Sequence, residues 1–327
     1  MRIQLNWFGE KLAARLADLE AGRITPAAPR DAATVMLLRC APDGRNRHRI
    51  GRATQPVSRG DDPPYPPMSA FGGRQPSGTS PDVEVLMLRR TAAMKFAPGA
   101  YVFPGGSVDP ADYGADVGWH GPSPEEFGAR LGASAEVARA LVCAAVRETF
   151  EEAGVLLAGA PGGGPLAAPP EPSGESAPSW EADRVALVSG TLTLAELLSR
   201  RGLVLRADLL VPWARWITPE GEPRRFDARF FAAALPDGQV ATGHEAEADH
   251  VAWLRPADAI ESAKAGTMSL LPPTATTLND FASAVAAGAG LADILGARRA
   301  IEPVQPRLVL EEGTAWLVIP EEVDYPL

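Results

Sequence analysis

Residues 147–155 read Arg147-Glu148-Thr149-Phe150-Glu151-Glu152-Ala153-Gly154-Val155. Its three glutamates stand at positions i, i+3 and i+4, so on a helix they form one stripe, made of Glu148, Glu151 and Glu152. Like charges held so close repel one another, and a bound cation would relieve this repulsion. Glutamate runs are also common on solvated helix faces, so the stripe alone leaves both interpretations open.

The pattern around this stretch predicts a helix over residues 134–154. Ser134 is a favourable N-cap, and Gly154 is the residue type that most often follows a helix. Apolar residues between them recur at spacings of three and four, as on one buried face. Upstream, residues 103–106 read Phe-Pro-Gly-Gly. They predict a strand-to-loop turn at which glycine lets a ligand approach the backbone closely.

These two motifs together resemble the Nudix hydrolases. The box of that family runs Gly, five residues, Glu, seven residues, then Arg-Glu-U-x-Glu-Glu-x-Gly-U, where U is apolar. The second half of the box fits residues 147–155, with one mild departure at Thr149, where an apolar residue is usual. The resemblance extends from about residue 32 to residue 310, and this half of the box is its most specific part.

The first half of the box is interrupted. Gly106 and Arg147 lie 41 positions apart, whereas the box requires 14. The glutamate of the first half falls on Arg139 when it is counted back from Arg147, and on Asp112 when it is counted forward from Gly106. We favour an insertion over about 112–138, with Asp112 standing in for that glutamate.

The resemblance implies a divalent metal ion, Mg²⁺ or Mn²⁺, bound by the box glutamates. Hydrolysis of a diphosphate needs a cation that neutralises phosphate oxygens and lowers the pKa of the attacking water, and both ions prefer oxygen ligands. Glu148 and Glu152, one helical turn apart, are the expected direct ligands, and Glu151 is expected to complete the metal site and serve in catalysis. Arg147 either orients a catalytic carboxylate or forms an ordinary helix salt bridge.

A second motif, ahead of the box, narrows the substrate. It resembles the signature of coenzyme A diphosphatases, in which an apolar strand end is followed by Arg-Ser, three residues, Arg, three residues, Gly, three residues and Phe-Pro-Gly-Gly. Here Thr91 replaces Ser and Lys95 replaces Arg, while the spacing is kept. The substrate-binding residues that this resemblance implies are Arg90, Lys95, Gly99, Gly105 and Gly106. Such a strand end and Pro-Gly turn also occur in ordinary strand pairs.

An acidic loop precedes the tryptophan-containing strand predicted at 251–254. Nudix enzymes often carry a metal ligand or general base in such a loop, and Glu245 and Glu247 are the two candidates for that catalytic role. The sequence does not choose between them, and a polar loop that merely joins two strands is the alternative.

Motifs at 213–219 and 224–231 extend the resemblance to organellar acyl-coenzyme A diphosphatases and their bacterial relatives. That branch implies metal-dependent cleavage of coenzyme A or acyl-coenzyme A to 3′,5′-ADP and (acyl-)4′-phosphopantetheine. By analogy it also implies a homodimer. The alternatives are hydrolysis of another nucleoside diphosphate derivative (a dinucleotide, a nucleotide sugar or a capped RNA) and a non-catalytic module that binds nucleotides.

The order of strand and helix patterns predicts an α/β fold. Apolar runs predict strands at 33–39, 83–88, 209–217, 226–235 and 251–254, a hairpin at 308–310 and 316–319, and further helices at 194–201 and 274–287. The resemblance refines this to a Nudix α/β/α sandwich with a mixed central sheet. We expect an amphipathic N-terminal extension over 1–31 and the Nudix domain over 32–327. Its long loop insertions are expected near 41–81, 112–138 and 159–178, and we expect the first two to lie outside the central sheet.

The composition argues against several classes of partner. Asp and Glu outnumber Lys and Arg by 41 to 31, which gives a net charge of −10 and disfavours salt-driven binding to nucleic acid or to an anionic membrane. No apolar run is long enough to span a bilayer. Two cysteines in 327 residues make a poor disulfide framework, so we expect a cytoplasmic protein whose partner is a small diphosphate substrate.

Overall fold

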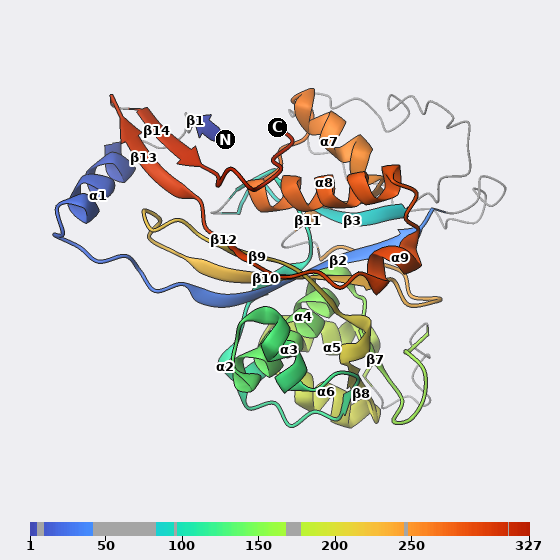
Figure 1. Ribbon diagram of the computed structural model, residues 1–327. Helices are drawn as coiled ribbons and strands as arrows, with labels where there is room; N and C mark the ends of the chain where they lie inside the picture. The colour runs from blue at the N-terminus through green and yellow to red at the C-terminus, as the bar shows by residue number, and fades with distance from the viewer. Residues whose placement is uncertain (5–9, 42–82, 95–96, 168–177, 245–247, 313) are drawn as a thin grey trace.

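The computed structural model describes residues 1–4, 10–41, 83–94, 97–167, 178–244, 248–312 and 314–327. Apart from residue 41, the insertion predicted near 41–81 lies outside the described residues. The same holds for residues 168–177 of the insertion predicted near 159–178. The helices α2 to α9, between residues 110 and 296, lie on the two sides of one large sheet, whereas α1 (Glu10–Glu20) lies beside β13 (Arg307–Glu311) (Figure 1).

Helices and strands are interspersed along the chain. The strands are β1 (Arg2–Gln4), β2 (Arg30–Cys40), β3 (Val83–Arg90), β4 (Tyr101–Val102), β5 (Gly105–Ser107), β6 (Trp119–His120), β7 (Ala158–Gly159), β8 (Val204–Arg206), β9 (Val211–Ile217), β10 (Phe226–Ala234), β11 (Ala248–Leu254), β12 (Pro303–Val304), β13 (Arg307–Glu311) and β14 (Thr314–Val318). The helices are α1 (Glu10–Glu20), α2 (Pro110–Tyr113), α3 (Pro124–Leu131), α4 (Ala135–Ala153), α5 (Trp180–Val188), α6 (Leu194–Arg201), α7 (Pro256–Lys264), α8 (Pro272–Ala286) and α9 (Leu291–Gly296).

The central sheet is mixed, as predicted. Its strand order is β11-β3-β2-β10-β9-β12, and the short strands β4 and β5 pair with β3 and β2. β2 is parallel to β10 and β12 is parallel to β9, while the other pairs in this order are antiparallel. All five strands predicted from apolar runs belong to this sheet.

β2 shows why the sheet is covered on both faces. Its side chains alternate between two hydrophobic clusters, since Val35 and Leu37 belong to the cluster that contains α4, and Met36 and Leu38 to the cluster that contains parts of α7, α8 and α9. All four are fully buried. A strand buried on both faces reads as a continuous apolar run, which is the pattern seen in the sequence.

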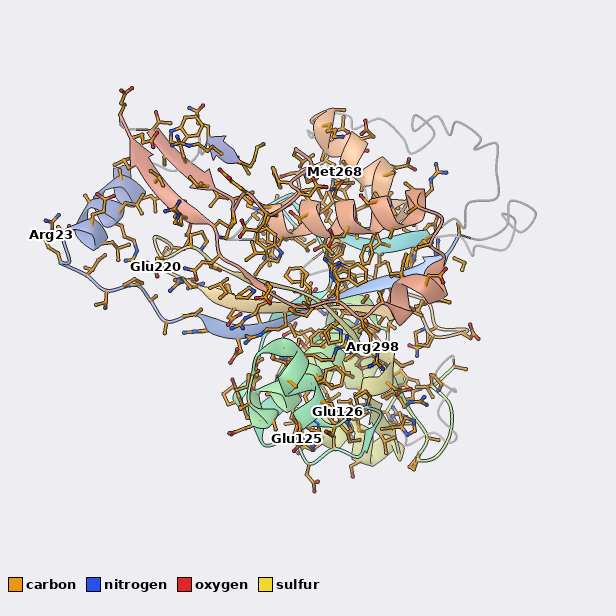
Figure 2. All side chains as sticks on the ribbon, viewed as in Figure 1. Arg23, Glu125, Glu126, Glu220, Met268 and Arg298 are labelled. Atoms are coloured by element: carbon orange, nitrogen blue, oxygen red, sulfur yellow. The ribbon has the colours of Figure 1, made fainter. Side chains whose placement is uncertain are left out.

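The result is the predicted α/β/α sandwich. Figure 1 shows α2 to α6 on one side of the sheet and α7 to α9 on the other. Figure 2 shows Glu125 and Glu126 of α3 on the first side and Met268, between α7 and α8, on the second. The helix predicted over 134–154 is α4, which packs directly on β2. Ser134 caps its start, and Gly154 ends it with φ of 67°.

The segment 112–134 lies outside the central sheet, as predicted. Its short strand β6 instead pairs with β8 in a separate sheet that also contains β7. This segment is more regular than a loop, however, because it also forms α2 and α3. α3 begins with a capping box of Ser123 and Glu126, a signal that is present in the sequence but lies outside any long periodic pattern.

A third sheet joins the two ends of the described chain. β1 pairs with β14, which forms the predicted hairpin with β13. The predicted amphipathic segment contains α1, whose Leu12 and Leu16 pack near Leu308 and Leu317. The boundary drawn at residue 31 stays a prediction. Among the described residues, no helix has the length and apolar character that crossing a membrane requires.

Candidate functional site

Two glycines at the start of β5, directly after the turn from β4, lie against β2 and α4; we call them the glycine turn. Gly105 pairs with Thr34 and Gly106 with Ala33. A Cβ atom on Gly105 would lie 2.4 Å from the carbonyl oxygen of Ala33, whereas a Cβ atom on Gly106 would lie 2.5 Å from a carboxylate oxygen of Glu148. A side chain at Gly105 would therefore clash with a neighbouring backbone, whereas a side chain at Gly106 would displace the carboxylate of Glu148.

Two of the predicted metal ligands meet at this turn. The carboxylate of Glu148 lies over Gly106, and the Oε2 atom of Glu152 accepts a hydrogen bond of 3.0 Å from the backbone N–H of Gly105. α4 thus presents two carboxylates, one turn apart, to two consecutive residues of the sheet edge. The structure brings together the four residues that the two sequence motifs singled out separately.

Arg147 lies at the centre of a group of carboxylates. Its Nη1 atom donates to Glu148 Oε1 at 2.8 Å and to Glu151 Oε1 at 3.3 Å, and its Nη2 atom donates to Asp112 Oδ2 at 2.9 Å and to the carbonyl of Ser107 at 3.0 Å. Burial by itself lowers the pKa of Arg147, but these carboxylates outweigh it and raise the pKa above its usual value. Arg147 therefore stays charged and orients two of the three box glutamates.

Asp112, the residue reached by counting forward from Gly106, contacts the box arginine. Its side chain is 3% exposed and accepts from Arg147 and from the backbone N–H of Asp109, so it completes the start of α2 while pairing with the box arginine. Arg139, the alternative position, instead donates to the carbonyls of Ala115 and Val117, which lie in the inserted segment. The structure thus places Asp112, and not Arg139, beside Arg147, and the role of Asp112 in place of the box glutamate stays a prediction.

The chemistry of these side chains suits a hard divalent cation. Mg²⁺ is usually held by one or two carboxylates together with waters and substrate phosphates, and Glu148 and Glu152 supply two such carboxylates. Among the residues that the structure describes, no three His, Cys, Asp or Glu side chains lie close enough together to hold a metal ion by themselves. Glu151 is directed to Arg147 instead. A ligand role for all three glutamates stays a prediction.

Comparison with known proteins identifies this arrangement. A family model described as the NUDT19 Nudix domain matches residues 124–280. Acyl-coenzyme A diphosphatase NUDT19 of Gallus gallus is 33% identical to the chain over 238 residues, and its counterpart from Homo sapiens is 33% identical over 224 residues. Over residues 124–280 the chain is similar to a Nudix domain.

The chain spans about three-fifths of these relatives. The alignment covers 62% of this chain and 62% of the Gallus gallus protein, and 58% of each chain for the Homo sapiens protein. A crystal structure of a Nudix hydrolase from Alicyclobacillus acidocaldarius superimposes with a TM-score of 0.58 at 24% identity, covering 84% of this chain and 99% of that one, which shows the shared fold. The matched family segment starts after Gly106 and Asp112, so the place of these two residues in the Nudix box rests on the structure.

The motif that resembles a coenzyme A diphosphatase signature begins at the end of β3. The backbone N–H of Arg90 donates to Ala100 at 2.9 Å, and the N–H of Gly99 donates to Arg90 at 3.0 Å, so the two residues close one loop ahead of the glycine turn. Lys95 is outside the described residues. Ala248, at the start of β11, pairs with Arg90, and Glu245 and Glu247 just before it are also outside the described residues.

Sequence reasoning missed two contacts that hold the elements of this site together. Arg184 of α5 binds the carbonyl of Glu151 and the residue Thr242, and Tyr113 of α2 donates to Asp31 at the start of β2. Arg184 precedes Thr242 by 58 positions and Tyr113 follows Asp31 by 82, and no local spacing rule joins residues so far apart. Arg184 lies beyond the insertion predicted near 159–178, in a stretch where the sequence analysis predicted no element.

The two glycines of the turn should respond differently to the same substitution. For Gly106→Ala we expect a loss of hydrolysis of at least about 10-fold with little change in thermal stability, because only the flexible end of Glu148 must move. For Gly105→Ala we expect destabilisation, because the new Cβ meets the backbone of β2. Turnover and melting temperature of both variants check this, and a Gly106→Ala variant with normal turnover would contradict the role given to Glu148.

Proposed function

We propose that this chain hydrolyses the diphosphate bond of coenzyme A or acyl-coenzyme A to 3′,5′-ADP and (acyl-)4′-phosphopantetheine. The observation that carries the chemistry is the meeting of Glu148 and Glu152 at the Gly105-Gly106 turn, beside an arginine that orients the neighbouring carboxylates. The substrate is supported by the names of the curated relatives and by the spacing of the signature that starts at Arg90.

In this proposal the chain holds Mg²⁺ or Mn²⁺ through Glu148 and Glu152, with Glu151 completing the site. The bound ion supplies charge neutralisation at the phosphate oxygens and a lowered pKa of the attacking water. Arg147 keeps the carboxylate of Glu148 in place, and the absence of side chains at Gly105 and Gly106 lets a phosphate group approach the carboxylates.

The remaining roles come from the sequence. Arg90 and Lys95 would bind substrate phosphates, and Glu245 or Glu247 would take the proton from the attacking water. A cytoplasmic location and a homodimer stay predictions, as does the choice between the two metal ions.

The substrate assignment predicts an uneven effect of losing Arg90. Coenzyme A carries a 3′-phosphate beyond its diphosphate, so Arg90→Ala or Lys95→Ala should lower kcat/KM for coenzyme A by roughly 10- to 100-fold, the loss of about 1.5–3 kcal/mol expected for a charged contact. A small diphosphate that lacks those groups should be affected much less. Hydrolysis of both compounds by each variant, with products identified, checks this prediction.

The unaltered protein is the control for this experiment. It should be tested on coenzyme A, acyl-coenzyme A, a dinucleotide, a nucleotide sugar and a capped RNA end. Good hydrolysis of the last three with none of coenzyme A or its esters would overturn the substrate and keep the chemistry. No hydrolysis of any of them with Mg²⁺ or Mn²⁺ would favour a binding module.

A further inference from the structure

Arg184 is a charged residue in an almost fully buried place. It lies in α5, and 4% of its side chain is exposed. Its Nε atom donates to the carbonyl of Glu151 at 2.8 Å, its Nη1 atom to Thr242 Oγ1 at 3.0 Å and its Nη2 atom to the carbonyl of Thr242 at 3.0 Å. We call this set of contacts among Arg184, Glu151 and Thr242 the Arg184 clamp.

The clamp closes the C-terminal end of the helix that carries the box. The last carbonyls of a helix have no partner within it, and a cation near them also interacts favourably with the helix dipole. Here Arg184 donates a hydrogen bond to the carbonyl of Glu151, and the N–H of Thr242 donates one of 2.9 Å to the carbonyl of Ala153. Gly154 makes this approach possible, because a Cβ atom there would lie 2.8 Å from Thr242 Oγ1.

The carbonyl that Arg184 holds belongs to the peptide unit joining Glu151 to Glu152. A shift of that unit moves the backbone from which the Glu152 side chain reaches Gly105. On its other side the clamp holds Thr242, which lies six positions before the start of β11 at Ala248. Ala248 in turn pairs with Arg90. The guanidinium therefore ties two segments that the proposed reaction needs in a fixed relation.

We propose that Arg184 is a positioning residue that fixes the carboxylate-bearing end of α4 for metal binding by holding Glu151 and Thr242 at once. This inference rests on the proposed metal-dependent hydrolysis. It assigns to Arg184 no contact with substrate or metal. Its planar fork spans both partners, which the single ammonium of lysine cannot do.

The test uses Arg184→Lys and Thr242→Val in the full chain. Mn²⁺ binding is measured by electron paramagnetic resonance of the free ion, and kcat and KM are measured with coenzyme A. Outer partners of metal ligands typically contribute 10- to 100-fold to metal affinity or activity. We expect Arg184→Lys to weaken Mn²⁺ binding at least about 10-fold and to lower kcat, and Thr242→Val, which loses one hydrogen bond of the clamp, to act in the same direction by less.

Arg206→Lys is the matched control. Arg206, in β8, is also buried, with 8% of its side chain exposed. Its guanidinium donates hydrogen bonds to the carboxylate of Asp208 and to the carbonyl of Gly163. If Arg184 had only a structural role, Arg184→Lys and Arg206→Lys would both lower the melting temperature, and both would leave the Mn²⁺ affinity unchanged. That outcome would overturn the proposal.

Two further outcomes separate this inference from the proposed function. If the unaltered protein binds Mn²⁺ and hydrolyses coenzyme A while both clamp variants do so equally well, only the positioning role fails. If the unaltered protein neither binds Mn²⁺ nor hydrolyses any diphosphate, the proposed function fails and this inference with it. If Arg184→Lys does not fold, Thr242→Val still tests the proposal, because the backbone contacts of residue 242 are kept. Normal Mn²⁺ affinity of Thr242→Val would then overturn the proposal.

Discussion

Glu152→Gln should lower the rate of coenzyme A hydrolysis by more than about 100-fold while leaving the melting temperature almost unchanged. A change in a partner of a metal ligand already costs about 10- to 100-fold, so loss of a ligand's charge should cost more. The fold is spared because the side-chain oxygen of glutamine can still accept the hydrogen bond from the N–H of Gly105. The rate of product formation, measured at saturating Mg²⁺ and at saturating Mn²⁺, gives the size of the effect.

Glu148→Gln and Glu136→Gln complete this experiment. Glu148→Gln should lose activity to a similar extent, with some additional loss of stability because it also weakens the ion pair with Arg147. Glu136 lies in the first turn of the same helix, so Glu136→Gln removes the same charge far from the glycine turn and should keep its activity. Near-normal turnover in both Glu148→Gln and Glu152→Gln would rule out the proposed metal site.

Arg147→Met should be the most destabilising substitution in the site. It leaves Asp112, 3% exposed, as a buried charge without its arginine, which typically costs about 3–5 kcal/mol of unfolding free energy. It also releases Glu148 and Glu151, so we expect a further loss of activity of about 10- to 100-fold. Urea unfolding gives the first quantity and turnover of the folded fraction gives the second.

A double variant separates the two effects. Asp112→Asn removes the unpaired charge and keeps an oxygen that can accept from the N–H of Asp109, so Arg147→Met combined with Asp112→Asn should regain part of the lost stability. Its activity should stay low, because Glu148 and Glu151 still lack their partner. If the losses of stability in the two single variants simply add in the double variant, the buried pair is not the source of the destabilisation.

The central sheet and α4 could be predicted because their signals are local. A buried strand is a run of apolar residues, and α4 has a capping serine, a regular apolar face and a terminal glycine within one stretch of chain. α3 was missed because an eight-residue helix offers little periodicity, although its capping box is legible.

Only those residues of the candidate site that belong to a sequence motif could be predicted. The family spacing gave the glutamates, the glycines and, by counting from Gly106, Asp112. The partners of Arg184 could not be found in this way, because Glu151 and Thr242 meet it only after α5 has packed on α4. The three carboxylates also differ more than their common stripe suggests, since Glu152 binds the glycine turn whereas Glu151 binds Arg147.

The pairing of β1 with β14 has a consequence for how the chain acquires its fold during synthesis. Arg2 and Val318 are paired although they lie 316 positions apart. At about 5–20 residues per second, a ribosome needs roughly 15–60 s to travel that distance. For all that time β1 has no partner strand, and Leu12 and Leu16 of α1 await the hairpin they will cover. The small sheet can therefore close only after translation has passed residue 318, whereas the central-sheet strands from β2 to β11 are complete once residue 254 has been added.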